Sequence, residues 1–214
     1  MVSPGAGDGA RGMFPRPATC PAPTFDRLRT PLKLHAKLHA KQDARHGRHA
    51  REAHPTHVLH PGDVVVATRG HRLETLLGSC VAIILTDPAR TVGAMSHVVH
   101  TGPMSVGSPS GTMHGESALQ RMFALLRECA LNPLMCEAYV IGGGNMFPRL
   151  VAGDTVGEAN IRWALDALSS RGIRTLATDA GGTTYRRLRW TVGPSAPDIV
   201  AVDVRSGAPQ PGGR

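Results

Sequence analysis

The chain has 214 residues and a formal net charge of +8, most of which lies in its first quarter. Residues 1–55 contain ten Lys or Arg and four Asp or Glu, whereas the rest of the chain is close to neutral. With aromatic residues at 4%, the sequence lacks the basic, aromatic-lined surface of a specific nucleic-acid binder. No apolar run approaches the roughly 20 residues that span a bilayer, which argues against membrane insertion. Four cysteines without a CxxC pair favour a reduced, cytoplasmic protein.

The composition divides the chain into three parts. Residues 1–55 form a basic extension rich in Pro, Gly and His, which we predict to be disordered. Residues 56–206 carry the hydrophobic patterns of a folded domain, and residues 207–214 form a second disordered tail. The histidines between positions 46 and 60 have mixed spacings and no acidic partners, so we expect no metal site there. We likewise expect no cofactor.

The predicted elements follow one another as a mixture of strands and helices. Strands are expected at residues 63–67, 81–85 and 92–99, and the last two are joined by a short turn at residues 87–90 that is typical of a hairpin. Residues 116–130 have the apolar stripe of an amphipathic helix, formed by Ala118, Met122, Leu125, Leu126 and Cys129.

A short strand at residues 138–141 ends in three glycines, and a second helix at residues 158–171 ends at Gly172, with Ile161, Leu165 and Leu168 facing inward. Strands at residues 173–177, 185–192 and 199–204 complete the pattern. Strands outnumber helices and several form hairpins, which favours an α+β fold with mixed sheets.

Cys80 is the residue most suited to chemistry. The small residues Gly78 and Ser79 precede it, and such a turn can expose backbone N–H groups to a substrate oxyanion. A thiol nucleophile also needs a base, and the hairpin would bring His97 back alongside Cys80. Residue type alone leaves alternatives open, because a cysteine before a Val/Ile run is often a small buried hydrophobe. On spacing, His100 and His114 are rivals for the role of base.

An ordered series of motifs resembles the CheD family of chemoreceptor glutamine deamidases. The series contains Leu77-Gly78-Ser79-Cys80-Val81, then Asp87-Pro88, then Gly93-Ala94-Met95-Ser96-His97-Val98. It begins with His60-Pro61-Gly62-Asp63, and it continues through Gly115-Glu116-Ser117-Ala118, Gly142-Gly143-Gly144-Asn145-Met146-Phe147 and Asp179-Ala180-Gly181-Gly182 with Arg186. The resemblance covers roughly residues 57–204. Each motif alone is weak, but the ordered series is specific.

The resemblance implies a fold and a set of catalytic residues. Cys80 would be the nucleophile, His97 the base, and Gly78 and Ser79 would contact the substrate. A threonine before the cysteine orients the histidine in this family, and Thr75 is the nearest match, with Glu74 at the other possible offset. The implied fold is a layered α-β-β-α sandwich with mixed sheets, similar to toxin-type cysteine deamidases.

The implied activity is conversion of glutamine side chains on methyl-accepting chemotaxis receptors to glutamate, with release of ammonia through a thioester. The implied location is the cytoplasm, in association with receptor arrays, and the implied partners are the receptors and a CheC-type phosphatase. An alternative is a catalytically silent adaptor that binds a CheC-like phosphatase or a receptor. A third possibility is the same chemistry on a protein that is not a receptor.

Overall fold

The structure is a computed structural model that describes residues 55–101, 111–148 and 155–203. The two segments for which disorder was predicted lie almost wholly outside these residues. The elements in chain order are β1 (Thr56–Val58), β2 (Val64–Thr68), β3 (Arg72–Leu77), β4 (Val81–Thr86), β5 (Val92–Val98), α1 (Gly115–Glu128), a 3-10 turn η1 (Pro133–Met135), β6 (Glu137–Gly142), α2 (Val156–Ser169), β7 (Arg174–Ala180), β8 (Thr184–Thr191) and β9 (Asp198–Asp203).

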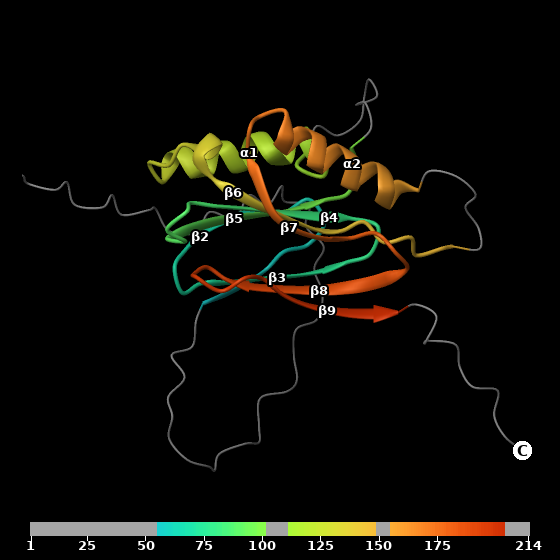
Figure 1. Cartoon of the computed structure of the whole chain (residues 1–214). Helices are drawn as coiled ribbons and strands as arrows, with labels where there is room; N and C mark the ends of the chain where they lie inside the picture. The colour runs from blue at the N-terminus through green and yellow to red at the C-terminus, as the bar shows by residue number, and fades with distance from the viewer. Residues whose placement is uncertain (1–54, 102–110, 149–154, 204–214) are drawn as a thin grey trace, which may run out of the picture.

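Two mixed β-sheets stack on each other, and both helices lie on the larger sheet (Figure 1). The larger sheet has the strand order β2-β5-β4-β6-β7 and the smaller one β1-β3-β8-β9. Among the strands of the described residues, the pairs β6–β7 and β1–β3 are parallel and the other five pairs are antiparallel. The predicted α+β class and its layered arrangement are therefore confirmed. Within the described residues no helix covers the outer face of the smaller sheet. The described part of the chain therefore shows three layers of the expected α-β-β-α sandwich, and the second helical layer does not occur in it.

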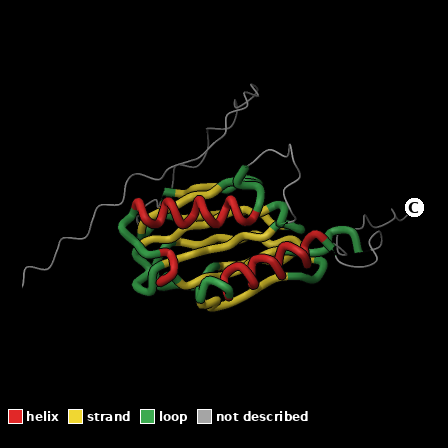
Figure 2. Tube along the Cα trace, turned by 90° about the horizontal axis from the view of Figure 1, so that it is seen from above, coloured by secondary structure: helices red, strands yellow, loops and turns green. Residues whose placement is uncertain are grey.

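The helices cover the larger sheet as the sequence pattern predicts. Helix α1 packs on β2 and β5, and α2 packs on β4, β6 and β7; Figure 2 shows both lying across the sheet. The predicted stripe of α1 is buried in full: Ala118, Met122, Leu125, Leu126 and Cys129. A Thr155–Glu158 capping box begins α2. Of the three α2 residues expected to face inward, Leu168 is fully buried, and Ile161 and Leu165 are partly buried against the same core.

Two hydrophobic clusters hold the layers together. One lies between the helices and the larger sheet, and the other lies between the two sheets. Strands β4 and β5 contribute to both clusters because alternate side chains point to opposite faces. All six residues of β4 and all seven of β5 are buried, which accounts for the continuous apolar run at residues 81–85.

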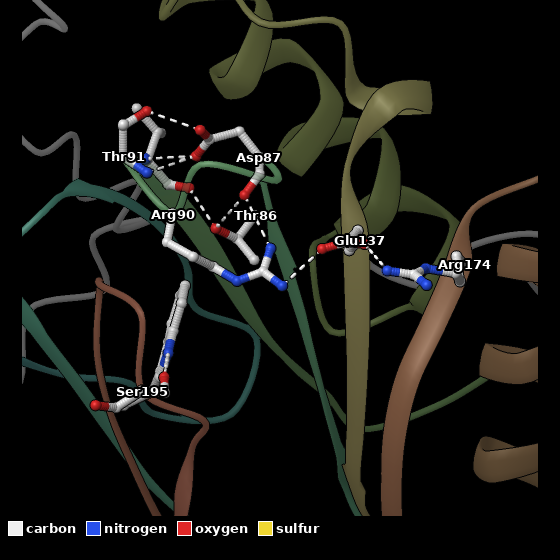
Figure 3. Close-up of polar contacts among 9 residues, drawn as sticks. Thr86, Asp87, Arg90, Thr91, Glu137, Arg174 and Ser195 are labelled. Atoms are coloured by element: carbon white, nitrogen blue, oxygen red, sulfur yellow. Dashed lines mark hydrogen bonds and ion pairs between the residues drawn. The ribbon is translucent and has the colours of Figure 1, made fainter.

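The β4–β5 hairpin is fixed by a polar network at its turn (Figure 3). One carboxylate oxygen of Asp87 accepts hydrogen bonds from the backbone N–H groups of Thr91 (2.8 Å) and Val92 (2.9 Å), and the other accepts one from the Thr91 hydroxyl (2.9 Å). Arg90 forms an ion pair with Glu137 on β6 (2.6 Å). This network sets the register of the hairpin and hence which residues of β4 and β5 lie opposite each other.

The structure contains two strands that the sequence analysis did not predict. Strand β3 lies between β1 and β8, and the three-residue β1 pairs with it in parallel. Strand β3 alternates between buried and partly exposed side chains, as expected for a sheet with one face toward a core. Among the described residues no helix has the length and apolarity needed to cross a membrane.

Candidate active site

Cys80 lies in the turn that connects the two sheets. Residues 78–80 leave β3 of the smaller sheet and enter β4 of the larger one. Cys80 is partly buried and packs against the cluster between the sheets. Its thiol therefore lies at the edge of the intersheet layer, where it is neither fully solvated nor sealed in the core.

His97 occupies the neighbouring strand on the same face. In the antiparallel register, Ala82 of β4 lies opposite His97 of β5. Cys80 comes two residues before Ala82, so its side chain shares that face and is the diagonal neighbour of His97. Only 3% of His97 is exposed. The predicted hairpin therefore brings the two residues to adjacent positions on one face.

Thr75 of β3 holds the His97 ring from the opposite sheet. The Thr75 hydroxyl donates a hydrogen bond to the Leu59 carbonyl (2.9 Å) and lies 2.9 Å from Nδ1 of His97. A hydroxyl has a single proton, so one that donates to Leu59 must accept from the imidazole. In neutral His97 the proton then lies on Nδ1, and Nε2 is left with a free lone pair. The arrangement fixes the tautomer that a general base requires.

Both groups are neutral in the free protein near pH 7. Burial lowers the pKa of His97 from 6.5 to about 4, and this effect outweighs its hydrogen bonding toward Leu59 and the charge of Asp63, which raise it. Burial also raises the pKa of the Cys80 thiol, with a smaller opposing effect from its own backbone N–H. The candidate site therefore holds a thiol beside a neutral imidazole.

The alternative candidates from the sequence lie in different surroundings. Glu74 lies on the other side of β3 from Thr75, near Arg72 (3.8 Å) and Arg189 (3.7 Å). His100 and His114 form an isolated backbone bridge, and their rings are tilted by 47° with centroids 5.9 Å apart. Of the three candidate histidines, His97 is the one hydrogen-bonded to Thr75.

The triple glycine at the end of β6 supports the turn that carries Cys80. The Gly143 N–H donates to the Cys80 carbonyl and the Gly144 N–H donates to the Gly78 carbonyl, each at 2.8 Å. A Cβ atom on Gly142 would lie 2.3 Å from the Cys80 carbonyl oxygen, so only glycine permits this approach. In the sequence the triple glycine indicates only the end of a strand, and no local signal connects it with Cys80.

Asn160 on α2 is a further residue of the site that the sequence analysis missed. It is 1% exposed, and its side-chain amide donates to the carbonyls of Ser79 (3.1 Å) and Val99 (3.0 Å). A signal was present, because Asn160 lies on the same helix face as Ala164, Ala167 and Leu168. A polar residue on a buried face usually satisfies a specific partner.

Arg186 links the two sheets near the same end of the molecule. It is 6% exposed, and its Nε lies 2.9 Å from a carboxylate oxygen of Asp179 on β7, while an Nη donates to the Thr184 carbonyl (3.3 Å). The late glycine turn that resembles a family motif is therefore tied to β8 through this ion pair. Among the described residues no group of three or more His, Cys, Asp and Glu side chains is arranged to hold a metal ion.

Comparison with known proteins identifies relatives of this chain. Residues 103–194 match the family model described as CheD chemotactic sensory transduction, a region that begins after β5. A protein of Albidiferax ferrireducens named probable chemoreceptor glutamine deamidase CheD 2 is 35% identical over 63% of this chain and 80% of its own length. Probable chemoreceptor glutamine deamidases CheD of Pseudomonas fluorescens and Rhodospirillum rubrum are 37% and 33% identical, over 61% and 64% of this chain and 76% of each relative. With this coverage and identity, the chain belongs to the CheD family.

Proposed function

We propose that the chain is a protein-glutamine deamidase that converts glutamine side chains of methyl-accepting chemotaxis receptors to glutamate. The names of its relatives support the reaction and the substrate class. The observation that carries the proposal is the hydrogen-bonded series from His97 through Thr75 to Leu59, beside Cys80. This series leaves Nε2 of His97 as the acceptor for a proton, which is what a cysteine nucleophile needs from its base.

In the first half of the proposed reaction, Cys80 attacks the side-chain amide carbon of a receptor glutamine. The thiol proton moves to Nε2 of His97 as the sulfur–carbon bond forms, and the carbonyl electrons move onto oxygen. The oxyanion is held by backbone N–H groups of the turn formed by Gly78, Ser79 and Cys80. The imidazolium then protonates the amide nitrogen, the carbon–nitrogen bond breaks, and ammonia leaves a thioester on Cys80.

In the second half, water replaces ammonia. His97 accepts a proton from the water as it attacks the thioester carbon, and a second oxyanion forms at the same position. Collapse of this intermediate breaks the sulfur–carbon bond and returns the proton to Cys80. The product is a glutamate side chain, so each cycle adds one negative charge to the receptor.

We assign this activity to residues 56–206 and place the protein in the cytoplasm, where receptor arrays present their signalling domains. A CheC-type phosphatase is a further proposed partner. Residues 1–55 and 207–214 have no role in the proposed chemistry, because the residues assigned to it lie between Leu59 and Asn160.

One observation favours a second candidate function, that of a catalytically silent adaptor. The raised pKa of the Cys80 thiol is also what a buried cysteine without a catalytic role would have. The adaptor would bind a receptor or a CheC-like phosphatase without chemical turnover. The Thr75–His97 contact argues for the enzyme, since an adaptor has no need for a histidine held in one tautomer.

The proposal is tested by incubating the full chain with cytoplasmic fragments of several chemoreceptors and following their intact mass. The wild-type protein is expected to add about one mass unit per modified glutamine, as an amide becomes an acid. Cys80→Ala is expected to lose activity by a factor on the order of 10⁴ or more. Cys136→Ala, at a second free cysteine that is buried on the far side of the larger sheet, is the matched control and is expected to retain activity.

The outcomes separate the two functions. A mass gain that disappears in Cys80→Ala alone supports the enzyme and its nucleophile. Absence of any mass gain with every receptor fragment, together with stable binding to one of them, would favour the adaptor.

A further inference from the structure

Each carbonyl group of the nucleophile turn, residues 78–80, accepts a hydrogen bond from a residue between positions 143 and 160. The Gly78 carbonyl accepts from Gly144 N–H, the Ser79 carbonyl from the Asn160 amide, and the Cys80 carbonyl from Gly143 N–H. Two of these donors are backbone groups of the triple glycine. The third is a side chain on α2, about 80 residues away in sequence and accessible to substitution.

Fixing these carbonyls also fixes the direction of the turn's N–H groups. In a trans peptide the C=O and the following N–H point in opposite directions, and no described peptide bond is cis. The carbonyls of Gly78 and Ser79 point toward β6 and α2, so the N–H groups of Ser79 and Cys80 point away from them. Within the part of the chain that the structure describes, neither N–H donates a hydrogen bond to another residue, and the Cys80 N–H interacts with its own sulfur. Two N–H groups that no other residue occupies, beside a candidate nucleophile, are suited to bind an oxyanion.

Asn160 also ties the nucleophile turn to the strand of the base. The same Nδ2 that donates to Ser79 donates to the Val99 carbonyl, two residues beyond His97. Its Oδ1 accepts from the Thr101 hydroxyl (3.0 Å), which fixes the orientation of the amide. A single buried side chain therefore contacts the residue before the nucleophile and the segment that follows the base.

We propose that Asn160 is a positioning residue that holds the Ser79 and Cys80 N–H groups toward the reacting carbonyl oxygen and keeps this turn in register with His97. The inference rests on the proposed function for its biological substrate, but the property it assigns is narrower. It concerns the ability of Cys80 to pass through an oxyanion with any acyl donor.

A purely structural role for Asn160 makes a different prediction. If the residue only joins α2 to the sheet, its loss would change stability and would slow every reaction of Cys80 to a similar extent. If it positions the N–H groups, its loss would slow reactions that form an oxyanion and spare those that do not. Alkylation of the thiol by iodoacetamide forms no oxyanion, whereas acylation by p-nitrophenyl acetate does.

The experiment compares these two reactions in the full chain carrying Asn160→Asp. Aspartate keeps the shape of asparagine, but its carboxylate has no N–H to donate and its charge is repelled by the two carbonyl dipoles. Cys80→Ala supplies the background rate from the other cysteines. Thr155→Ala is the matched control, because it removes the N-cap of the same helix without touching the turn.

In Asn160→Asp, acylation is expected to fall by about 10²-fold or more while alkylation stays within about twofold of the wild-type rate. Thr155→Ala is expected to retain both rates. Thr101→Val, which removes only the contact that orients the amide, is expected to give a smaller loss of acylation in the same direction. This second variant keeps the test decisive if Asn160→Asp fails to fold, because Thr101 is half-buried and its loss is milder.

Three results would overturn the inference: equal losses of acylation and alkylation, no loss of acylation in either variant, or a wild-type protein that is not acylated at Cys80. Receptor deamidation is measured separately. A wild-type protein that is acylated at Cys80 in an Asn160-dependent manner but deamidates no receptor would refute the proposed function and leave the positioning role standing. Normal receptor deamidation by Asn160→Asp would refute the positioning role and leave the proposed function standing.

Discussion

The burial of a neutral His97 predicts that mild acid destabilises the fold through this one residue. The folded protein has a His97 pKa of about 4, against 6.5 for a solvated histidine. Between these values the unfolded chain binds a proton that the folded chain does not, so stability rises with pH in this window. The free energy of unfolding has its full value above about pH 6.5, and protonation of His97 in the unfolded chain lowers it progressively as the pH falls toward about 4.

The magnitude follows from the two pKa values. At about pH 5 the unfolded histidine is almost fully protonated and the folded one is mostly neutral, which costs about 2 kcal/mol relative to pH 7.5. Other groups also contribute to the pH dependence of stability, including His57, whose pKa is lowered by burial and by His71. The loss due to His97 must therefore be isolated by substitution.

The assay is denaturant unfolding of wild type and His97→Asn at about pH 7.5 and pH 5. Asparagine places an amide near the position of Nδ1, can still donate to Thr75, and does not titrate. The substitution itself changes the free energy of unfolding, so the change between the two pH values is compared. This change should be about 2 kcal/mol smaller in His97→Asn than in wild type. His100→Asn, at an exposed histidine, is the matched control and should keep the wild-type dependence. Equal losses in wild type and His97→Asn would refute a buried, neutral His97.

Three further predictions follow from particular contacts. Thr75→Val should lower the rate of deamidation by about 10²-fold or more, because His97 loses its fixed tautomer, while Thr75→Ser keeps the hydroxyl and most of the rate. Asp87→Ala should lower the free energy of unfolding by about 2–4 kcal/mol, measured by denaturant titration, because three donors at the hairpin turn lose their acceptor. Ala130 follows α1 with φ of 58°, and its N–H and that of the next residue close the helix end. Ala130→Gly should therefore stabilise the fold by about 0.5–1 kcal/mol in the same assay, whereas Ala124→Gly inside α1 should destabilise it by a similar amount.

The parts of the fold that the sequence predicts well are those with a strong local pattern. Residues 81–85 are apolar throughout and residues 92–99 are mostly apolar because β4 and β5 are covered on both faces, and Asp87 marks the turn between them. Helix α1 has a regular stripe because one face alone contacts the core. In these elements the local pattern and the tertiary environment agree.

Strand β3 shows where such patterns fail. Its sequence ends in two leucines, of which Leu77 is buried and Leu76 is 59% exposed, so the alternation that identifies a half-buried strand is obscured. Strand β1 is three residues long and depends on β3 for its pairing. Thr75 lies on β3, which the sequence pattern did not predict. Its role beside His97 was therefore expected from the family resemblance alone.

The candidate site was predictable to a different degree for each residue. The hairpin from Cys80 to His97 is a short-range feature, so the sequence suffices to bring the two side chains to one face. The contacts from Asn160 and the triple glycine join segments that are 60 or more residues apart. No local pattern encodes such pairings, although a buried-face asparagine is a sign that one exists.

The most direct test of the account is to detect the covalent intermediate on Cys80. The full chain is mixed with a receptor cytoplasmic fragment, quenched in acid within the first turnover, digested and analysed by mass spectrometry. The proposed mechanism predicts a thioester between Cys80 and a receptor glutamine position, formed with loss of ammonia and absent from Cys80→Ala. Deamidation that continues in Cys80→Ala, or an adduct on a different residue, would contradict it.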